Sequence, residues 1–240
     1  HIFANLPRHA PLLSKFAPLL HLRDRIPGLA QISENLLGIK GNRKLPEWSS
    51  SPFRDEEVTP QPGEKTVVLF TDTFGTWFEP QGLRDAVTVL QNSGYEVQAL
   101  GASSSSSRLC CGRTYLSSGL LREARQEALK VIGRLHKFVE SGIPVVGLEP
   151  SCMFTIRDDY PSLVPGQDSE ALASHVQLLD EFLFQEHQKG QLKLPLQKIS
   201  QEKIWVHGHC HQKAANATGS TLGILQTIPA VSYTHLTLPT

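Results

Sequence analysis

The chain has 240 residues, is 40% hydrophobic and 19% charged, and carries no net charge at pH 7. This length supplies enough apolar surface for one sizeable core or two small ones. The charge balance argues against nucleic acid or any broad anionic surface as a partner. No apolar run approaches the roughly 20 residues of a membrane span, and the start of the chain is not a signal peptide.

Four cysteines in a chain of this length are too few for a disulfide scaffold. They indicate a reducing compartment, in which clustered Cys and His point to a metal site or to reactive thiols. We therefore predict a cytoplasmic protein, with peripheral attachment to the inner membrane as the alternative.

Residues 1–63 are predicted to be a proline-rich linker that drapes over the domain, with short helical pieces at Leu12–Leu20 and Leu29–Leu37. Trp48 and Phe53 stand in a polar context and are expected to anchor this segment on a neighbour. The alternative is a docking surface for a preceding domain. The prolines are Pro7, Pro11, Pro18, Pro27, Pro46, Pro52, Pro60 and Pro62.

Short apolar runs typical of buried parallel strands begin at Lys65. These runs are Thr66–Phe70, Tyr95–Leu100, Pro144–Leu148 and Lys203–His207. Helices are predicted between and after them, at Pro80–Ser93, Gly119–Val139, Ser169–Gln188 and Ala214–Leu225. The alternation predicts an α/β fold with a mostly parallel sheet, flanking helices and right-handed crossovers.

A loop rich in candidate ligands follows each predicted strand. These loops hold Asp72, the Cys110–Cys111 pair, Cys152 and Cys210 in turn. In open α/β sheets ligands bind at the carboxyl ends of the strands, so we expect the four loops to converge. The serine run Ser103–Ser107, just before the cysteine pair, is either part of this loop or a flexible spacer.

Thiolates suit zinc, copper(I) and iron–sulfur clusters, and imidazole suits zinc and iron. The sequence has no Cys-x-x-Cys, which excludes a ferredoxin pattern or a simple zinc ribbon. Any site that uses these cysteines must therefore be assembled by the fold. Glu149 and Asp72 are candidate ligands or bases, and as loop acids they could equally cap the helices that follow them.

His207, His209 and His211 alternate along the chain, which places them on one side, with Cys210 on the other, if the strand continues. His209 and His211 are candidate ligands or proton carriers, and the alternative is that they bond loop carbonyls. A cysteine nucleophile paired with a histidine also stays open. Neither a Gly-x-Ser-x-Gly elbow nor a phosphate loop is present.

Together these motifs resemble the CCG-type cysteine-rich domain of iron–sulfur oxidoreductases. That family includes heterodisulfide reductase B subunits, glycolate oxidase iron–sulfur subunits and the C subunit of anaerobic glycerol-3-phosphate dehydrogenase. The closest branch looks like the fused FAD-linked dehydrogenases of D-2-hydroxy acids, namely D-lactate or D-2-hydroxyglutarate. The matching segments lie in the family's order between residue 65 and about residue 229: Leu69–Phe74, Phe78–Pro80, Cys110–Arg113, Ser117–Leu121, Gly147–Cys152 and His209–Ala214.

The resemblance implies an electron-transfer module that holds an iron–sulfur cluster or another metal, iron or zinc. The candidate metal ligands are Cys110, Cys111, Cys152, Cys210, Glu149 and Asp72, and the candidate catalytic residues are His209 and His211. It also implies preceding FAD and ferredoxin-like domains in the same polypeptide, and a quinone or a carrier as electron acceptor. FAD would bind only to that preceding part, so we do not expect this chain alone to oxidise a hydroxy acid.

The chain departs from the family pattern, which is a lone Cys, then Cys-Cys-Gly, then Cys-Pro-x-Cys, all occurring twice. Asp72 or Thr73 stands at the lone Cys, and Glu149 stands at the first Cys of Cys-Pro-x-Cys. These exchanges favour a mixed-ligand metal site over an all-cysteine one. The second repeat contains Cys210 but stops before its own Cys-Cys-Gly.

We therefore expect three parts after the linker: a complete CCG half at 64–199, the start of a second half at 200–230, and a non-native tail at 231–240 that suits no regular element. The first residue is His1 and not Met, which predicts a processed chain or a piece of a longer one. The native sequence is expected to end near Pro229.

A second hypothesis is a structural or docking domain with partly vestigial cysteines and no redox centre. Sulfurs of the cysteine pair more than about 8 Å from that of Cys152 would favour it, because Zn–S and Fe–S bonds are near 2.3 Å. A zinc hydrolase that uses His209 and His211 is a third. The sequence leaves open whether the chain is itself an enzyme.

Overall fold

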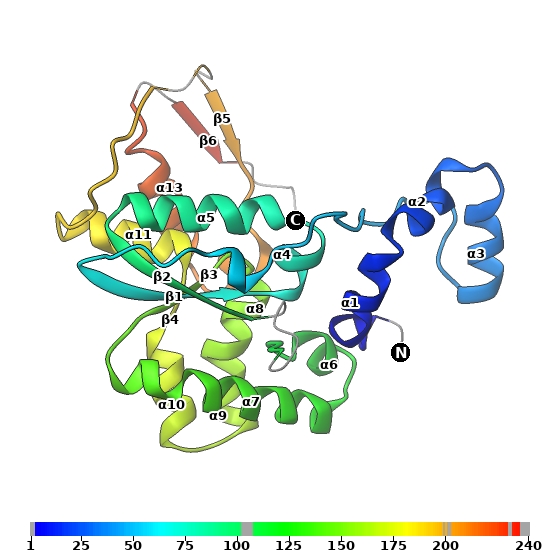
Figure 1. Ribbon diagram of the computed structural model, residues 1–240, viewed down its shortest axis with the longest axis horizontal. Helices are drawn as coiled ribbons and strands as arrows, with labels where there is room; N and C mark the ends of the chain where they lie inside the picture. The colour runs from blue at the N-terminus through cyan, green and yellow to red at the C-terminus, as the bar shows by residue number, and fades with distance from the viewer. Residues whose placement is uncertain (1–2, 102–107, 199, 201–202, 230–231, 236–240) are drawn as a thin grey trace.

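The computed structural model describes residues 3–101, 108–198, 200, 203–229 and 232–235. Its main sheet has four parallel strands in the order β2-β1-β3-β4, with helices on both faces (Figure 1). The strands are β1 (Lys65–Thr71), β2 (Tyr95–Gly101), β3 (Val145–Gly147) and β4 (Val176–Leu178). The predicted α/β fold with a parallel sheet is confirmed.

Each face of the sheet is covered by its own set of helices. One face carries α5 (Pro80–Asn92) and α11 (Leu179–Gln188). The other carries α7 (Leu121–Glu140), α8 (Pro150–Phe154), a π-helical turn (Thr155–Asp159), α9 (Tyr160–Leu163) and α10 (Gln167–His175). Two shorter helices, α4 (Thr73–Trp77) and α6 (Arg113–Ser117), follow β1 and the cysteine pair.

The alternation of side chains along β1 fills both layers of the core. Val68 and Phe70 are fully buried on the α7 side, and Val67 and Leu69 are fully buried on the α5 side. A strand buried on both faces is a continuous apolar run, which is why it could be recognised in the sequence. The predicted helices at 80–93 and 119–139 are confirmed to within about two residues, because each presents an apolar stripe of period 3.6.

The prediction of one helix over Ser169–Gln188 is wrong, because β4 interrupts it. Val176 leaves the helical region with φ −91° and ψ 129°, and β4 pairs with β3 in parallel. Val176 and Leu178 are buried, so the pairing gains core contacts that continued helix would lose. A three-residue strand between two helices has no turn residues to mark it.

The N-terminal segment forms three short helices, α1 (Leu6–Lys15), α2 (Ala17–Arg25) and α3 (Leu29–Leu37). The predicted helix at 12–20 is wrong, because the chain breaks at Phe16 and Pro18 opens α2. The predicted α3 is confirmed, and Gly38 ends it in the left-handed region with φ +70°. A 3₁₀ turn at Asp55–Glu57 leads towards β1.

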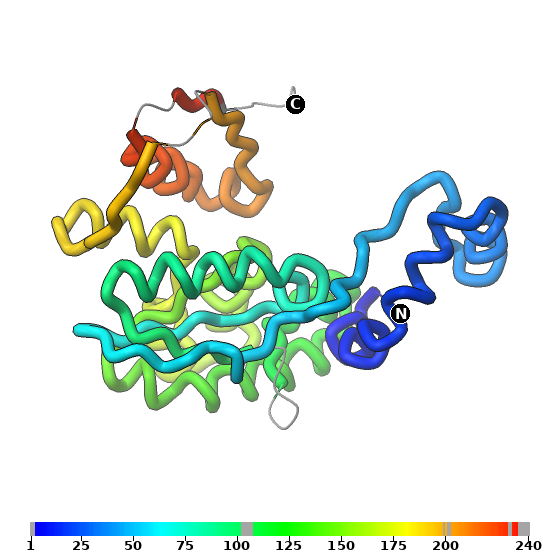
Figure 2. The backbone as a smooth tube through the Cα atoms, turned by 45° about the horizontal axis from the view of Figure 1, so that its top comes forward, coloured from blue at the N-terminus to red at the C-terminus, as the bar shows by residue number. Residues whose placement is uncertain are grey.

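The C-terminal part differs from the prediction in two places. The helix predicted at 214–225 is split into α12 (Cys210–Ala214) and α13 (Thr218–Leu225). The tail, predicted to form no element, contributes β6 (Ser232–His235), which pairs in parallel with β5 (Lys203–Val206). Tyr and Thr favour pleated structure, and β5 offers them an edge. Figure 2 shows this pair apart from the main sheet, and α1–α3 extending to one side.

The strand order fixes where a ligand can bind. From β1 the chain moves to β2 on one side, and it then crosses to β3 on the other side of β1. In doubly wound sheets the crevice at such a reversal, outside the carboxyl ends of the strands, is the usual binding site. Here that crevice lies between the ends of β1 and β3. None of the described helices combines the length and the apolar character of a membrane span.

Phe53 anchors the linker in the core, as the sequence predicted. Its side chain is 1% exposed within the α5-side cluster, and its backbone N–H donates to the carbonyl of Thr76 at 3.0 Å.

We predict that Phe53→Ala lowers the free energy of unfolding by about 3–5 kcal/mol through the cavity it leaves. Denaturant unfolding measures this. Phe16→Ala, at a residue 52% exposed, is the control and should change stability by about 0.5 kcal/mol. Equal losses in both variants would contradict the anchor.

Candidate functional site

Two carboxylates stand where β1 and β3 end. Asp72 is the N-cap of α4, and its Oδ1 accepts the backbone N–H groups of Phe74 and Gly75 at 2.8 and 2.9 Å. Glu149 is the N-cap of α8, and its Oε1 accepts the N–H and the O–H of Ser151 at 3.1 and 2.5 Å. The capping role that the sequence left open for both acids is therefore present.

Three of the four cysteines form a buried cluster beside these caps. The Sγ atoms of Cys111 and Cys152 are 2.9 Å apart, and the N–H of Gly112 donates to Cys110 Sγ at 3.3 Å. All three thiols are free and buried. The loops after β2 and β3 converge as predicted. The distance between the sulfurs of Cys111 and Cys152 is far below the limit of about 8 Å. A larger distance would have favoured a docking domain with no redox centre, so the sulfur distance does not support that hypothesis.

Glycines shape this cluster at two positions. Gly112 has φ +80°, and a Cβ there would lie 3.2 Å from the carbonyl of Ala124 in α7. A Cβ on Gly147, the last residue of β3, would lie 2.3 Å from the sulfur of Met153. The glycine of Cys-Cys-Gly thus turns the chain into α6 against α7, and Gly147 lets α8 lie close over the sheet.

The environment keeps the three thiols protonated at neutral pH. The hydrogen bond with Cys111 and burial raise the pKa of the Cys110 thiol well above its ordinary value. The hydrogen bond with Cys111 lowers the pKa of Cys152, but burial and the carboxyl of Asp72 outweigh it and raise that pKa to about 11. A metal would therefore have to displace protons from these sulfurs, which makes its binding depend on pH.

Asp72 has a hydrogen-bond acceptor that no donor contacts. Its Oδ2 is buried and has no hydrogen-bond partner, and the residue is only 2% exposed. Burial raises the pKa of Asp72 to about 6 and outweighs the N–H bonds that lower it, with Glu149 adding to the rise. An acceptor buried without a donor costs about 1–3 kcal/mol, so a ligand that approaches Oδ2 would recover that free energy.

The candidate ligand atoms are of a type that suits a metal, but the present distance between two of the sulfurs is too short. Three soft sulfurs and one carboxylate oxygen are ligands that zinc and iron accept. Two thiolates on one tetrahedral ion stand about 3.8 Å apart, given bonds near 2.3 Å, so Cys111 and Cys152 would have to separate by about 1 Å. In agreement with this, no three His, Cys, Asp or Glu side chains among the described residues are arranged as a metal site.

The second ligand loop is arranged differently from the sequence expectation. The strand does not continue past Val206, so the histidines do not alternate on one face. His209 caps α12, and its Nδ1 accepts the N–H of His211 at 3.2 Å. Cys210 is exposed on the first turn of α12, outside the buried cysteine cluster. α12 nevertheless packs against α8, which carries Cys152.

His211 is the histidine that approaches the cluster. Its Nδ1 is buried and unpartnered, and its ring stacks on that of His209 with centroids 5.1 Å apart. Burial lowers the pKa of His211, with the Arg113 charge next in size, while the Glu149 carboxyl acts in the opposite direction. The guanidinium of Arg113 is in turn paired with Asp159 at 3.3 Å. His211 is therefore neutral at pH 7 and lies near the Glu149 cap.

Tyr160 is a site residue that the sequence did not reveal. It is fully buried, and its O–H donates to the backbone carbonyl of Cys111 at 3.0 Å. The π-helical turn before it, at 155–159, brings it to this position. Such turns gather at functional sites, but they have no sequence signature. The serine run at 103–107 lies outside the described residues.

Comparison with known proteins relates the chain to dehydrogenases. The C subunit of the anaerobic glycerol-3-phosphate dehydrogenase of Escherichia coli K12 is 29% identical over 226 residues, which are 92% of this chain and 55% of the relative. D-2-hydroxyglutarate dehydrogenase of the same organism is 22% identical over 230 residues, 90% of this chain and 21% of that enzyme. The Haemophilus influenzae D-2-hydroxyglutarate dehydrogenase is 24% identical over 212 residues, which are 83% of this chain and 20% of that enzyme.

The chain thus spans about half the length of the first relative and about a fifth of the others. No protein-family model matches it, and no solved structure does. The relatives support the resemblance at the level of a part of an oxidoreductase.

Asp72 gives the stability of the metal-free protein a defined pH dependence. The folded state holds a proton on this carboxyl up to about pH 6, whereas the unfolded state releases it near pH 4, so stability falls as the pH rises through this window. Asp72→Asn removes the effect and keeps an oxygen for the α4 cap. We predict that the stability of the variant relative to wild type increases by about 2 kcal/mol from about pH 4 to about pH 7. Urea unfolding across that range measures it, and a constant difference would show that the carboxyl titrates normally.

Proposed function

We propose that the chain is the metal-binding electron-transfer module of a flavin-linked dehydrogenase. The observation that carries the proposal is the convergence of three buried thiols and an unpartnered carboxylate at the carboxyl edge of the sheet. Cys110, Cys111 and Cys152 would hold an iron–sulfur cluster or a single iron or zinc ion. Asp72 or Glu149 would supply the fourth ligand.

The residues around the thiols are suited to tune such a centre. Cys111 and Cys152 lie within the apolar core on the α7 side, which keeps water from their sulfurs. The N–H of Gly112 donates to a sulfur, and the O–H of Tyr160 fixes the backbone of Cys111. Hydrogen bonds and burial of this kind set the potential of a metal–thiolate centre. An iron centre, when bound, supplies one-electron transfer.

The substrate would belong to the whole protein and not to this chain. The matched motifs favour a D-2-hydroxy acid such as D-lactate or D-2-hydroxyglutarate, and the relatives from Escherichia coli and Haemophilus influenzae carry the name D-2-hydroxyglutarate dehydrogenase. Glycerol 3-phosphate is the second candidate, supported by the 29% identity over 92% of the chain. FAD and ferredoxin-like domains would precede the module, and a quinone or a carrier would accept the electrons.

The second ligand loop has a proposed role of its own. We assign His211 as the proton carrier, because its buried Nδ1 lacks a partner beside the Arg113–Asp159 pair. His209 would position it through the bond to its backbone N–H. Residues 64–199 would be the first CCG half and 200–230 the start of a second, consistent with the position of β5 outside the main four-stranded sheet.

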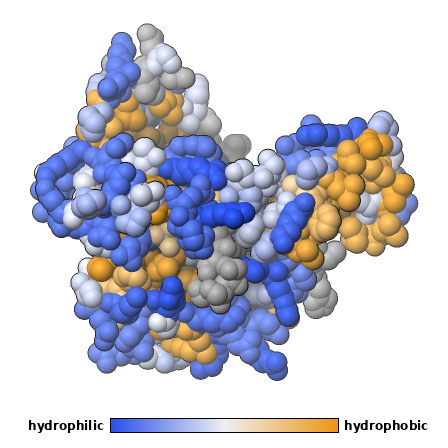
Figure 3. Space-filling model, viewed as in Figure 1, coloured by the Kyte–Doolittle hydropathy of each residue, from blue (hydrophilic) through white to orange (hydrophobic). Residues whose placement is uncertain are grey.

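A docking function is the second candidate, and the α2–α3 hairpin favours it. The hairpin exposes large apolar side chains, among them Ile32, Leu36 and Leu37 at 53%, 77% and 55%. They gather beside a cavity of about 730 Å³, and Figure 3 shows apolar surface over this part of the molecule. Apolar patches of this kind mark interaction sites. We propose that a further domain of the same polypeptide packs here.

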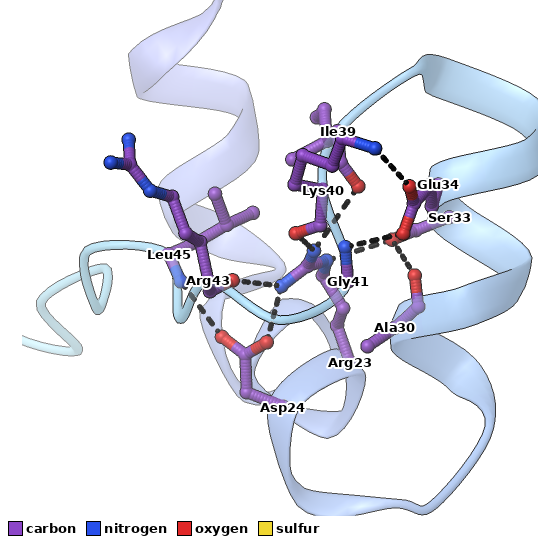
Figure 4. Close-up of polar contacts among 10 residues, drawn as sticks. All are labelled: Arg23, Asp24, Ala30, Ser33, Glu34, Ile39, Lys40, Gly41, Arg43 and Leu45. Carbon is purple, nitrogen blue, oxygen red and sulfur yellow. Dashed lines mark hydrogen bonds and ion pairs between the residues drawn. The ribbon is translucent and has the colours of Figure 1, made fainter.

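A polar network holds the hairpin in shape without help from a partner (Figure 4). The Arg23 guanidinium donates to Ser33 Oγ at 2.8 Å and to the backbone carbonyls of Lys40 and Arg43 at 3.0 and 3.1 Å. Glu34 accepts the N–H of Gly41 at 2.8 Å. These bonds tie α2 to α3 and to residues 40–43, so the exposed apolar side chains are held in place before contact, which lowers the entropic cost of docking.

Metal reconstitution tests the electron-transfer proposal. The protein is loaded anaerobically with ferrous iron and sulfide, or with zinc, and the bound metal is measured by elemental analysis and electron paramagnetic resonance. We predict at least a tenfold loss of bound metal in Cys110→Ala/Cys111→Ala and in Cys152→Ala, because these remove buried ligands. Cys210→Ala, at the exposed cysteine, is the matched control and should retain the metal.

Equal metal in wild type and the double variant would contradict the ligand assignment. If wild type itself bound no metal at any thiol, the docking function would be favoured. Circular dichroism on each variant separates loss of ligands from loss of the fold.

A further inference from the structure

A cavity of about 500 Å³ lies at the reversal point of the sheet, and Asp72 and Glu149 line it whereas none of the cysteines does. It is bounded by the end of β3, by α4, by the first turn of α5, and by α1 with the linker. Its walls are largely apolar, with Leu6, Trp48, Phe74, Phe78 and Leu148 among the larger side chains. This volume suits a small organic molecule.

The aromatic wall is continuous. The rings of Trp48 and Phe78 are 4.3 Å apart between centroids, and those of Phe74 and Phe78 are 6.2 Å apart. The faces of such rings attract cations through their quadrupole, most strongly for Trp. Gly82, in the first turn of α5, leaves open space at the side of this wall, since a Cβ there would meet only Leu148, at 3.7 Å.

All the ionisable groups that line the cavity are acids. They are Asp72, Glu79 and Glu149, and none of the described lining residues is basic. Asp72 is 2% exposed, and its Oδ2 has no donor. Three carboxylates repel an anion, so neither a hydroxy acid nor a phosphate ester fits this cavity. A positive donor would pair with Oδ2 in a charge-assisted hydrogen bond and balance the remaining charge.

We propose that this cavity binds an organic ammonium compound, with its apolar body against the Trp48–Phe78 wall and its N–H donors on Asp72 Oδ2. Glu149 and Glu79 lie at the same end and add attraction. The inference does not depend on a metal at the cysteines. It concerns a cavity that the same carboxylate lines, and it is tested on protein to which no metal has been added.

Three probes with similar bodies and different charge test the proposal: 2-phenylethylamine, 2-phenylethanol and phenylacetate. Their dissociation constants are measured by calorimetry at neutral pH. The chain has three tryptophans, so the location is reported by the part of the fluorescence quenching that Trp48→Phe removes. We expect the amine to bind at least tenfold more tightly than the alcohol, and phenylacetate to bind least. Equal or tighter binding of the alcohol would overturn the ammonium assignment in favour of a neutral ligand, and no binding of any probe would overturn the site.

Two matched pairs of variants place the ligand. Gly82→Leu fills the cavity and should abolish binding of the amine, whereas Gly133→Leu, at an exposed glycine in α7 with open space around it, should leave it unchanged.

Asp72→Asn should weaken binding of the amine at least tenfold and binding of the alcohol less than threefold. Asp85→Asn, at an acid of α5 outside the cavity, is its control. Amine binding that survives both Gly82→Leu and Asp72→Asn would contradict the assignment. Metal content is a separate readout, so this inference and the electron-transfer proposal can fail independently.

Discussion

The parallel pairing of β1 with β2 on one side and with β3 on the other is the constraint on which the structure depends. It brings the ends of three strands to one edge, so the acids after β1 and β3 meet the cysteines after β2 and β3. Because β1 is buried on both faces, a shift of its register by one residue would move each core side chain into the opposite layer and disrupt the packing of both. The position of the candidate site is thus a consequence of how the sheet is packed, and the helices on either face hold that arrangement.

The candidate site contains groups that stabilise the fold and polar atoms that lack a partner. Asp72 caps α4 with one oxygen and leaves the other buried and unpaired, which is unusual for a group whose only role is to cap. The three thiols stay protonated and packed in the core while no metal displaces their protons. A metal held by the thiols, or a cation in the cavity, would relieve the same unpaired oxygen. The two proposals therefore share one physical cause.

Much of the fold could be predicted, because each long element carries its period in the sequence. The strand at 65–71 is a continuous apolar run, and the helix at 121–140 has an apolar stripe. β4 could not be predicted, because three residues between helices are selected by pairing with β3 and not by local preference. β6 was missed for the same reason, since its pairing with β5 decides its conformation.

Some residues of the candidate site could likewise be predicted from the sequence, and others could not. The cysteine pair, Cys152 and Asp72 could be placed together because each follows a strand. Cys210 and His209 also follow a strand, but β5 pairs with β6 and not with the main sheet, so that loop approaches from outside. Tyr160 stayed hidden, because a π-helical turn carries it to the carbonyl of Cys111.

X-ray absorption at the metal edge of the reconstituted chain tests the central claim most directly, because it counts the atoms bound to the metal. For a single zinc or iron ion, we predict about three sulfur neighbours near 2.3 Å and one lighter atom near 2.0–2.2 Å. A shell made only of nitrogen and oxygen would contradict the thiol assignment, since the metal would then lie away from the three buried cysteines.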